Sequence, residues 1–304
     1  MGIEPVSRGI WCGPLQLRVW EWNPGGARTV LCVHGHLDFA LAWAPIVPPV
    51  VEAGYRVLAP DLRGHGDSDW ISPDGSYHLW DFALDTSAVI DQLVAGKLAL
   101  VGHSMGGMIA AMLAAAFPGR ARRLVLLEGV GGGDREPPPA RFSAWIEEQR
   151  VTRTRTPAVY ASVEAAAARL RNVDRKCGDE MARWLASHGT RAVPGGWSFK
   201  HDPRLQTRGP VGTPLDVLRP YFGAVRCETL VLEGSESATT RRTADLAERY
   251  RCFRNARVER IAGAGHMLVR HKPQEVAERL LAFLAADRDG GEVNDFNAVE
   301  RAQG

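Results

Sequence analysis

The stretch LALVGHSMGGMIAAML, residues 98–113, decides the fold of this chain. Its apolar run stops at Gly102, a single serine, Ser104, stands between glycines, and a helical pattern follows at once. Residues 102–106, GHSMG, have the form G-x-S-x-G, in which a sharp turn between a buried strand and a helix raises the serine hydroxyl above the strand ends. A helix-capping serine is the simpler alternative. Because strand, turn and helix are all indicated, we predict that Ser104 is a nucleophile.

Apolar runs that end at glycine or aspartate recur along the chain and predict strands buried on both faces of a sheet. They cover residues 29–35, 55–61, 97–102, 123–129, 228–234 and 256–265. Helical patterns alternate with them at residues 41–53, 79–95, 104–117, 239–250 and 273–286. Residues 9–22 alternate apolar and polar around Gly13-Pro14, which indicates an antiparallel hairpin at a sheet edge. The fold class is therefore α/β, a mainly parallel sheet with helices on both faces.

One interval, from Gly131 to about Arg226, contains no buried-strand run. It opens with GGGDREPPP, continues through helical patterns and includes an irregular stretch, VPGGWSFKHDPRL. The helical patterns lie at residues 141–151, 157–171 and 178–188. We predict a helical cap inserted between two strands. The predicted organisation is a core over 1–133, the cap over 134–212, a second core part over 213–286, and a flexible C-terminal tail over 287–304.

Composition excludes several classes of function. The chain has 304 residues, 45% of them hydrophobic, and a net charge of +2, which argues against nucleic acid or an anionic membrane as its main partner. Its five cysteines lie far apart without C-x-x-C spacing, so we expect neither disulfides nor a metal site. Without a secretory signal or an apolar run long enough to span a membrane, the expected location is cytoplasmic. Phosphate-loop and dinucleotide fingerprints are absent, so we expect no cofactor. Monomer and homodimer are equally compatible with the sequence.

A serine nucleophile needs a base and an oxyanion hole. His266 follows the last predicted strand in a glycine-rich loop, at the same sheet edge as Ser104, and is the predicted base. His271, five residues later, is expected at the surface at the start of a helix. The predicted oxyanion donors are the amides of Met105, next to the nucleophile, and of His36 in the loop VHGHLD.

The predicted substrate pocket combines residues near the elbow with cap aromatics. Its expected lining residues are His36, Leu37, His103, Trp145 and Trp184. For the His36 side chain, a polar pocket wall without a binding role is the alternative. For the two tryptophans, packing within the cap is the alternative.

Together these residues resemble the α/β-hydrolase superfamily. The resemblance covers the chain except for cap and tail and is carried by HGHLD, DLRGHGDSD, GHSMGG and AGHMLV. Within the superfamily, SYHLWDFALD (76–85), LAAAFPGRARRLVLLEG and HDPRL look most like the serine hydrolase-like group. The resemblance implies an eight-stranded sheet with the site beneath a helical cap. Related haloalkane dehalogenases and epoxide hydrolases carry Asp at the elbow, where this chain has Ser104, so neither activity is expected.

The acid that would orient His266 is open to three assignments. Enzymes of this kind often carry it as Asp in a G-x-x-D turn after the penultimate strand, but here residues 234–237 read GSES. The candidates are Glu236, one position early, Glu233 at the strand end, and Glu128 at the end of the strand after the elbow helix. Glu128 is preferred because a buried strand-end carboxylate needs a partner, and His266 becomes a cation during turnover. The resemblance agrees, since in some haloalkane dehalogenases the acid follows that strand.

The expected function is hydrolysis of a carboxylic ester or thioester of a small acyl compound through an acyl-enzyme on Ser104. One alternative is carbon–carbon bond hydrolysis or acyl transfer by the same residues. The other is a catalytically inactive binding or interaction module on the same fold, which the missing G-x-x-D acid keeps open.

Overall fold

Apolar side chains of the central strands alternate between two faces, and this alternation builds two separate cores. The computed structural model describes residues 3–132, 138–207 and 209–286. On β3 (Arg28–Val33), Leu31 and Val33 belong to one buried cluster, whereas Val30 and Cys32 belong to the other. A strand buried in this way on both faces needs helices on both sides of the sheet.

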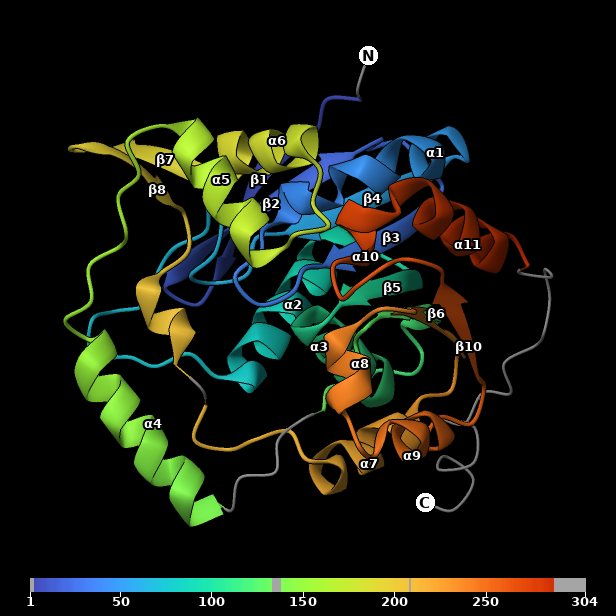
Figure 1. Ribbon diagram of the computed structural model, residues 1–304. Coiled ribbons are helices and arrows are strands. Elements are labelled where there is room, and N and C mark those ends of the chain that lie inside the picture. The colour runs from blue at the N-terminus through green and yellow to red at the C-terminus, as the bar shows by residue number, and fades with distance from the viewer. Residues whose placement is uncertain (1–2, 133–137, 208, 287–304) are drawn as a thin grey trace.

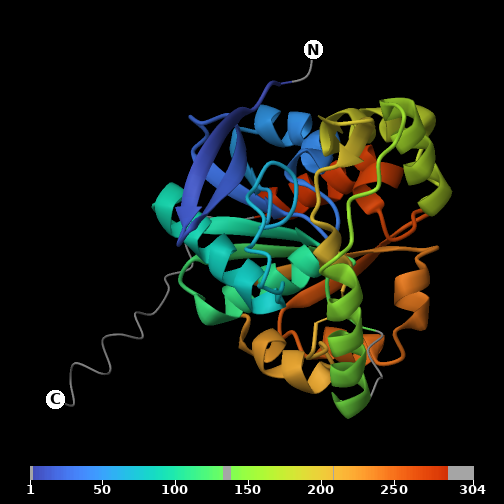
Figure 2. The same cartoon turned by 90° about the vertical axis from the view of Figure 1, so that its left-hand side faces the viewer.

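The main sheet has eight strands in the order β1-β2-β4-β3-β5-β6-β9-β10. Besides β3, these are β1 (Val6–Cys12), β2 (Leu15–Trp22), β4 (Tyr55–Pro60), β5 (Leu98–His103), β6 (Ala121–Leu127), β9 (Glu228–Gly234) and β10 (Ala256–Ile261). Only the pairs β1·β2 and β2·β4 are antiparallel, as the hairpin at the N-terminal edge requires, and the other pairs are parallel. The predicted α/β class is thus confirmed, with helices on both faces (Figures 1 and 2).

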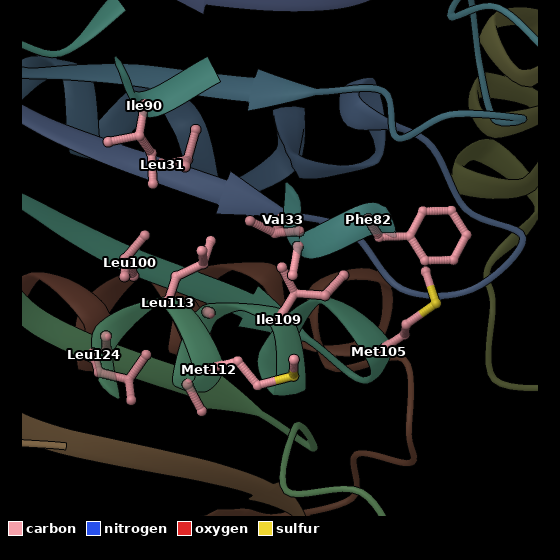
Figure 3. Close-up of a cluster of buried hydrophobic side chains, with 14 of the residues drawn as sticks. Leu31, Val33, Phe82, Ile90, Leu100, Met105, Ile109, Met112, Leu113 and Leu124 are labelled. Atoms are coloured by element: carbon pink, nitrogen blue, oxygen red, sulfur yellow. The ribbon is translucent and has the colours of Figure 1, made fainter. Parts of the chain in front are cut away.

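Each face of the sheet is covered by its own helices. One core contains residues of α2 (Leu79–Leu93), α3 (Met105–Ala116) and α7 (Leu215–Ala224). Figure 3 shows its centre, where Ile109 and Leu113 of α3 lie beside Val33 and Leu100 of the sheet. The other core contains residues of α1 (Val47–Glu52), α10 (Leu268–His271) and α11 (Pro273–Ala285). No helix within the described ranges is long and apolar enough to cross a bilayer.

The segment between β6 and β9 contains α4 (Pro138–Thr152), α5 (Val163–Val173) and α6 (Asp179–Gly189). It differs from the predicted cap in two ways. The stretch expected to be irregular holds an antiparallel hairpin, β7 (Thr190–Val193) and β8 (Gly196–Phe199), whose turn Pro194-Gly195 has a glycine φ of 88°. In addition, α4 lies apart from α5 and α6 in both views of the ribbon (Figures 1 and 2).

Two other predicted helices are interrupted in the structure. Prolines divide the segment expected at 41–53 into a 3₁₀ helix, η1 (Ala40–Ile46), and α1, which has proline in its first turn. The segment expected at 239–250 is α8 (Ala238–Arg242) followed by α9 (Leu246–Arg251). Thr243, between them, turns its hydroxyl back to the Thr239 carbonyl, a local bond that competes with helix continuation. The predicted tail, 287–304, and the first residues of the predicted cap, 134–137, lie outside the described residues.

Candidate active site

Ser104 occupies a strained turn between β5 and α3. Its backbone has φ 52° and ψ −117°, a conformation that residues with a side chain rarely adopt and that is maintained only where the surroundings hold it. Close packing does so here: a Cβ on Gly106 would lie 2.1 Å from the carbonyl oxygen of Val33, and one on Gly102 would lie 2.2 Å from the carbonyl oxygen of Gly106. The two glycines of the motif therefore allow β3, β5 and α3 to meet beneath the serine.

Three side chains from distant parts of the chain form one hydrogen-bonded row. His266 Nε2 lies 3.0 Å from Ser104 Oγ, and His266 Nδ1 lies 3.2 Å from Glu128 Oε2. Ser104 follows β5, Glu128 follows β6 and His266 follows β10, so all three lie at the carboxyl edge of the parallel strands. With Nδ1–H donating to the carboxylate, Nε2 is free to accept the serine proton.

Glu128 is held by three donors. Its Oε1 accepts from the Gly234 amide at 2.8 Å, and its Oε2 accepts from the Ser237 hydroxyl at 2.6 Å as well as from His266. Burial opposes ionisation of this carboxyl, but the bonds from His266, Ser237 and Gly234 outweigh burial and hold its pKa below the ordinary value. Glu128 also has a left-handed backbone, with φ 52°, which turns the chain at the end of β6.

Ser237 is a residue whose part in the site the sequence reasoning missed. It stands where related enzymes often carry the acid. Here its fully buried hydroxyl donates to the carboxylate of Glu128, which follows β6. The same oxygen caps α8 by accepting from the Thr240 amide. The sequence contained a signal for this contact. If Glu128 supplies the acid, the residue at the usual acid position, Ser237, is expected to face the Glu128 carboxylate.

The other two glutamates do not meet His266. Glu236 is about half exposed and pairs with Lys176 at 2.6 Å. Glu233 is buried and pairs with Arg260 at 3.2 Å, and its burial raises its pKa. Of the three acid candidates, the structure brings only Glu128 to the histidine.

The loop that carries His266 is anchored on both sides. His103 Nε2 donates to the backbone carbonyl of His266 at 2.9 Å, and the Gly265 amide donates to His271 Nδ1 at 3.0 Å. Burial lowers the pKa of His103 to about 4, so the ring is neutral at pH 7. The expectation that His271 lies at the surface is wrong: its side chain is only 4% exposed and is hydrogen-bonded to Asp174.

The predicted oxyanion donors belong to segments that lie beside Ser104. A Cβ on Gly35, next to His36, would be 3.3 Å from Ser104 Cβ. The loop is fixed by two histidines, since His34 Nε2 accepts from the Leu62 amide and His65 Nε2 accepts from the Leu37 amide. Within the described ranges, neither the His36 nor the Met105 amide donates to another protein group. Both amides are thus free for a ligand oxygen.

A cavity of about 850 Å³ lies between the carboxyl edge of the parallel strands and the inserted segment between β6 and β9. His36, Leu37 and His266 line its base, as expected for the first two. Its apolar wall includes Phe39, Tyr160, Leu170, Val173, Phe199 and Met267.

The other three predicted pocket residues lie elsewhere, which corrects that expectation. His103 is buried beneath the loop of His266, Trp145 stacks on Phe142 of α4, and Trp184 stacks on His188 of α6. The His36 side chain donates to the Leu205 carbonyl at 2.7 Å and so ties the base of the cavity to the inserted segment. No cluster of three or more His, Cys, Asp or Glu side chains suited to a metal ion occurs in the part of the chain that the structure describes.

The elbow, the order of the strands and the site agree with a known family. A model of the alpha/beta hydrolase fold matches residues 28–188, more than half of the chain. The chain belongs to the alpha/beta hydrolase fold family. The predicted superfamily resemblance is confirmed.

This alpha/beta hydrolase is similar to a serine hydrolase-like protein from Danio rerio, with 28% identity over 71% of this chain and 68% of the relative. Over a shorter span, 36% of this chain and 38% of the relative, it is 40% identical to a 2-hydroxy-6-oxononadienedioate/2-hydroxy-6-oxononatrienedioate hydrolase from Klebsiella pneumoniae. Among solved structures it resembles the thioesterase domain from the curacin biosynthetic pathway, with 28% identity, a TM-score of 0.83, and coverage of 91% of this chain and 99% of that domain. The family and these similarities support hydrolase activity.

Proposed function

We propose that this alpha/beta hydrolase cleaves carboxylic esters or thioesters through an acyl-enzyme on Ser104. His266 takes the hydroxyl proton as Oγ attacks the substrate carbonyl, and then gives that proton to the departing alcohol or thiol. A water that His266 deprotonates next attacks the acyl-enzyme, which releases the acid and restores Ser104. Glu128 holds His266 in the required tautomer and stabilises the imidazolium that forms in each step.

The observation that carries the proposal is the unbroken row Ser104–His266–Glu128, with contacts of 3.0 and 3.2 Å. The Ser104 hydroxyl faces the nitrogen that would accept its proton, and the opposite ring nitrogen faces the carboxylate that would orient the ring. Glu128 remains ionised at pH 7 because its pKa is held low, so this buried carboxylate can balance the charge of a histidine cation.

The backbone around Ser104 supports acyl chemistry. The amides of Met105 and His36 are the proposed donors to the oxyanion that forms when the carbonyl is attacked. The first follows the nucleophile directly, and the second belongs to a loop held by two buried histidines, so neither must reorganise during the reaction. Loss of one such donor typically reduces the rate about 10²–10³-fold.

The cavity supports a small-molecule acyl substrate. Its volume of about 850 Å³ and its apolar wall suit a partly apolar acyl chain, with the carbonyl at its base beside His266. The similarity to a thioesterase domain makes thioesters a natural part of the substrate panel.

The proposal is tested with Ser104→Ala and an exposed-serine control, Ser187→Ala. We expect Ser104→Ala to abolish hydrolysis of p-nitrophenyl butyrate and of matched acyl thioesters, and the control to keep wild-type rates. A fluorophosphonate should label wild type and control stoichiometrically at Ser104. Undiminished turnover in Ser104→Ala would refute the nucleophile. Failure of the wild type to label would favour an inactive binding module.

A second candidate, carbon–carbon bond hydrolysis, is favoured by the 40% identity to the dienedioate hydrolase over 111 residues. The same base and oxyanion donors can serve a bond cleavage next to a ketone. Activity on a vinylogous 1,5-diketone, with no turnover across an ester and thioester chain-length series, would select it. Product analysis with an acyl donor and added alcohol separates acyl transfer from hydrolysis.

A further inference from the structure

A second histidine–carboxylate pair lies next to the proposed catalytic base and joins it to the inserted segment. His271, at the end of α10, places Nε2 2.8 and 2.9 Å from the two carboxylate oxygens of Asp174. Asp174 is the C-cap residue of α5, directly after its last residue. Both side chains are shielded from solvent, with 4% exposure for His271 and 14% for Asp174. The proposed triad does not use this pair.

The second ring nitrogen of His271 contacts the loop that carries the proposed base. Its Nδ1 accepts a hydrogen bond from the backbone amide of Gly265, the residue before His266. Because an N–H group points at Nδ1, the ring proton must reside on Nε2, where it is donated to Asp174. The order Asp174, His271, Gly265, His266 is therefore one continuous chain of contacts that ends at the proposed base.

Packing around Gly265 shows how tightly this contact is made. A Cβ on Gly265 would lie 3.3 Å from His271 Cε1 and 3.6 Å from Cδ of Lys176. Lys176, two residues after Asp174, also pairs with Glu236 in the turn that carries Ser237. Residues 174–176 thus contact both loops behind the triad, the one with the base and the one that supports the acid.

We propose that Asp174 and His271 are positioning residues, which hold the Gly265 amide and thereby keep His266 in line with Ser104 while the end of α5 is docked on the core. This inference rests on the proposed function, because it concerns the same base. Asp174 also lines the substrate cavity, so a direct contact with substrate is the rival explanation. A positioning role affects the reactivity of Ser104 even toward a small reagent, whereas a substrate contact changes KM.

The test compares Asp174→Ala, which leaves the buried Nε2–H of His271 without an acceptor, with Asp174→Asn, which retains an oxygen there. A displacement of about 1 Å at a catalytic group costs about 10²-fold. We expect Asp174→Ala to lower kcat and the rate of fluorophosphonate labelling roughly 10- to 100-fold, with KM within threefold, and Asp174→Asn to recover most of the loss. His271→Phe, which keeps a ring at this position but removes the acceptor for the Gly265 amide and the donor to Asp174, should also label slowly.

Tyr77→Phe is the matched control. It removes another buried hydrogen bond between core and inserted segment, which Tyr77 donates to Asp202 at 2.8 Å, together with the bond that the same hydroxyl accepts from the Ile71 amide at 3.3 Å. We expect it to lower stability but to leave labelling within twofold of wild type. Labelling of Asp174→Ala within twofold of wild type, or a loss no greater than that of Tyr77→Phe, would overturn the inference. A change confined to KM would do so too.

Amide hydrogen exchange at Gly265 tests the positioning role of Asp174 and His271 independently of the proposed function. Exchange at Gly265 should accelerate in Asp174→Ala and His271→Phe but not in Tyr77→Phe, whether or not Ser104 reacts. Unchanged exchange in both variants would overturn the inference. If the wild type does not label while exchange responds as expected, the proposed function fails and the anchoring of the loop stands.

Discussion

Replacing Glu128 with glutamine should impair catalysis by changing the histidine tautomer, not by unfolding the chain. The two carboxylate oxygens face different donors: Oε1 faces the Gly234 amide, which can only donate, whereas Oε2 faces the Ser237 hydroxyl, which can reverse. A glutamine will therefore direct its carbonyl oxygen to Gly234 and its NH₂ group to Ser237 and His266. Facing a donor, His266 Nδ1 must become an acceptor, which moves the ring proton to Nε2.

The expected loss of kcat follows from the position of that proton. With Nε2 protonated, His266 cannot accept the Ser104 proton, and the carboxylate charge that would stabilise the imidazolium is gone. In a serine protease, the same carboxylate-to-amide change lowers kcat about 10⁴-fold through the wrong tautomer. We expect a similar loss for Glu128→Gln, which corresponds to about 5.4 kcal/mol of barrier height.

The assay is p-nitrophenyl butyrate hydrolysis with thermal unfolding in parallel, and Glu236→Gln is the control. Glu236 is half exposed and its partner is Lys176, an arrangement worth little in stability. The control should therefore remain within about threefold of wild type, since exposed ion pairs contribute roughly 0–1 kcal/mol. A Glu128→Gln enzyme within tenfold of wild type, or an equal loss in Glu236→Gln, would refute the reasoning.

Two further predictions concern the surroundings of Glu128. Ser237→Ala removes a buried donor to a charged group, so its free energy of unfolding, measured in urea, should fall by about 1.5–3 kcal/mol and the pKa of Glu128 should rise. The prediction fails if stability is unchanged. Because the folded-state pKa of Glu128 lies below its ordinary value of 4.5, its ionised form stabilises the fold above that pH, and this contribution disappears as pH falls through the folded-state pKa. The stability difference between wild type and Glu128→Gln should thus shrink as pH falls below about 4.5, and a difference as large at pH 3 as at pH 5 would contradict this sign.

Much of the fold could be predicted because its signals are local. The buried strands are continuous apolar runs, and the antiparallel edge is a hairpin with its own turn. The structure differs from the predicted elements at Pro194-Gly195, a short turn that joins β7 and β8 within a stretch expected to be irregular, and where prolines and a threonine interrupt a helical pattern. The separation of α4 from α5 and α6 depends on packing between segments and has no local signature.

By itself, the sequence determined the α/β class, the elbow at Ser104 and the place of His266 after the last strand. It left the acid open among three glutamates, because each lies near a strand end and the choice depends on where a side chain 138 residues from His266 points. Only the tertiary structure brought Glu128 to the histidine, turned Ser237 toward it, and enclosed His271 with Asp174. Parallel strands bring their carboxyl ends to one edge regardless of chain order, so the sequence can place residues at that edge, whereas packing decides which of them touch.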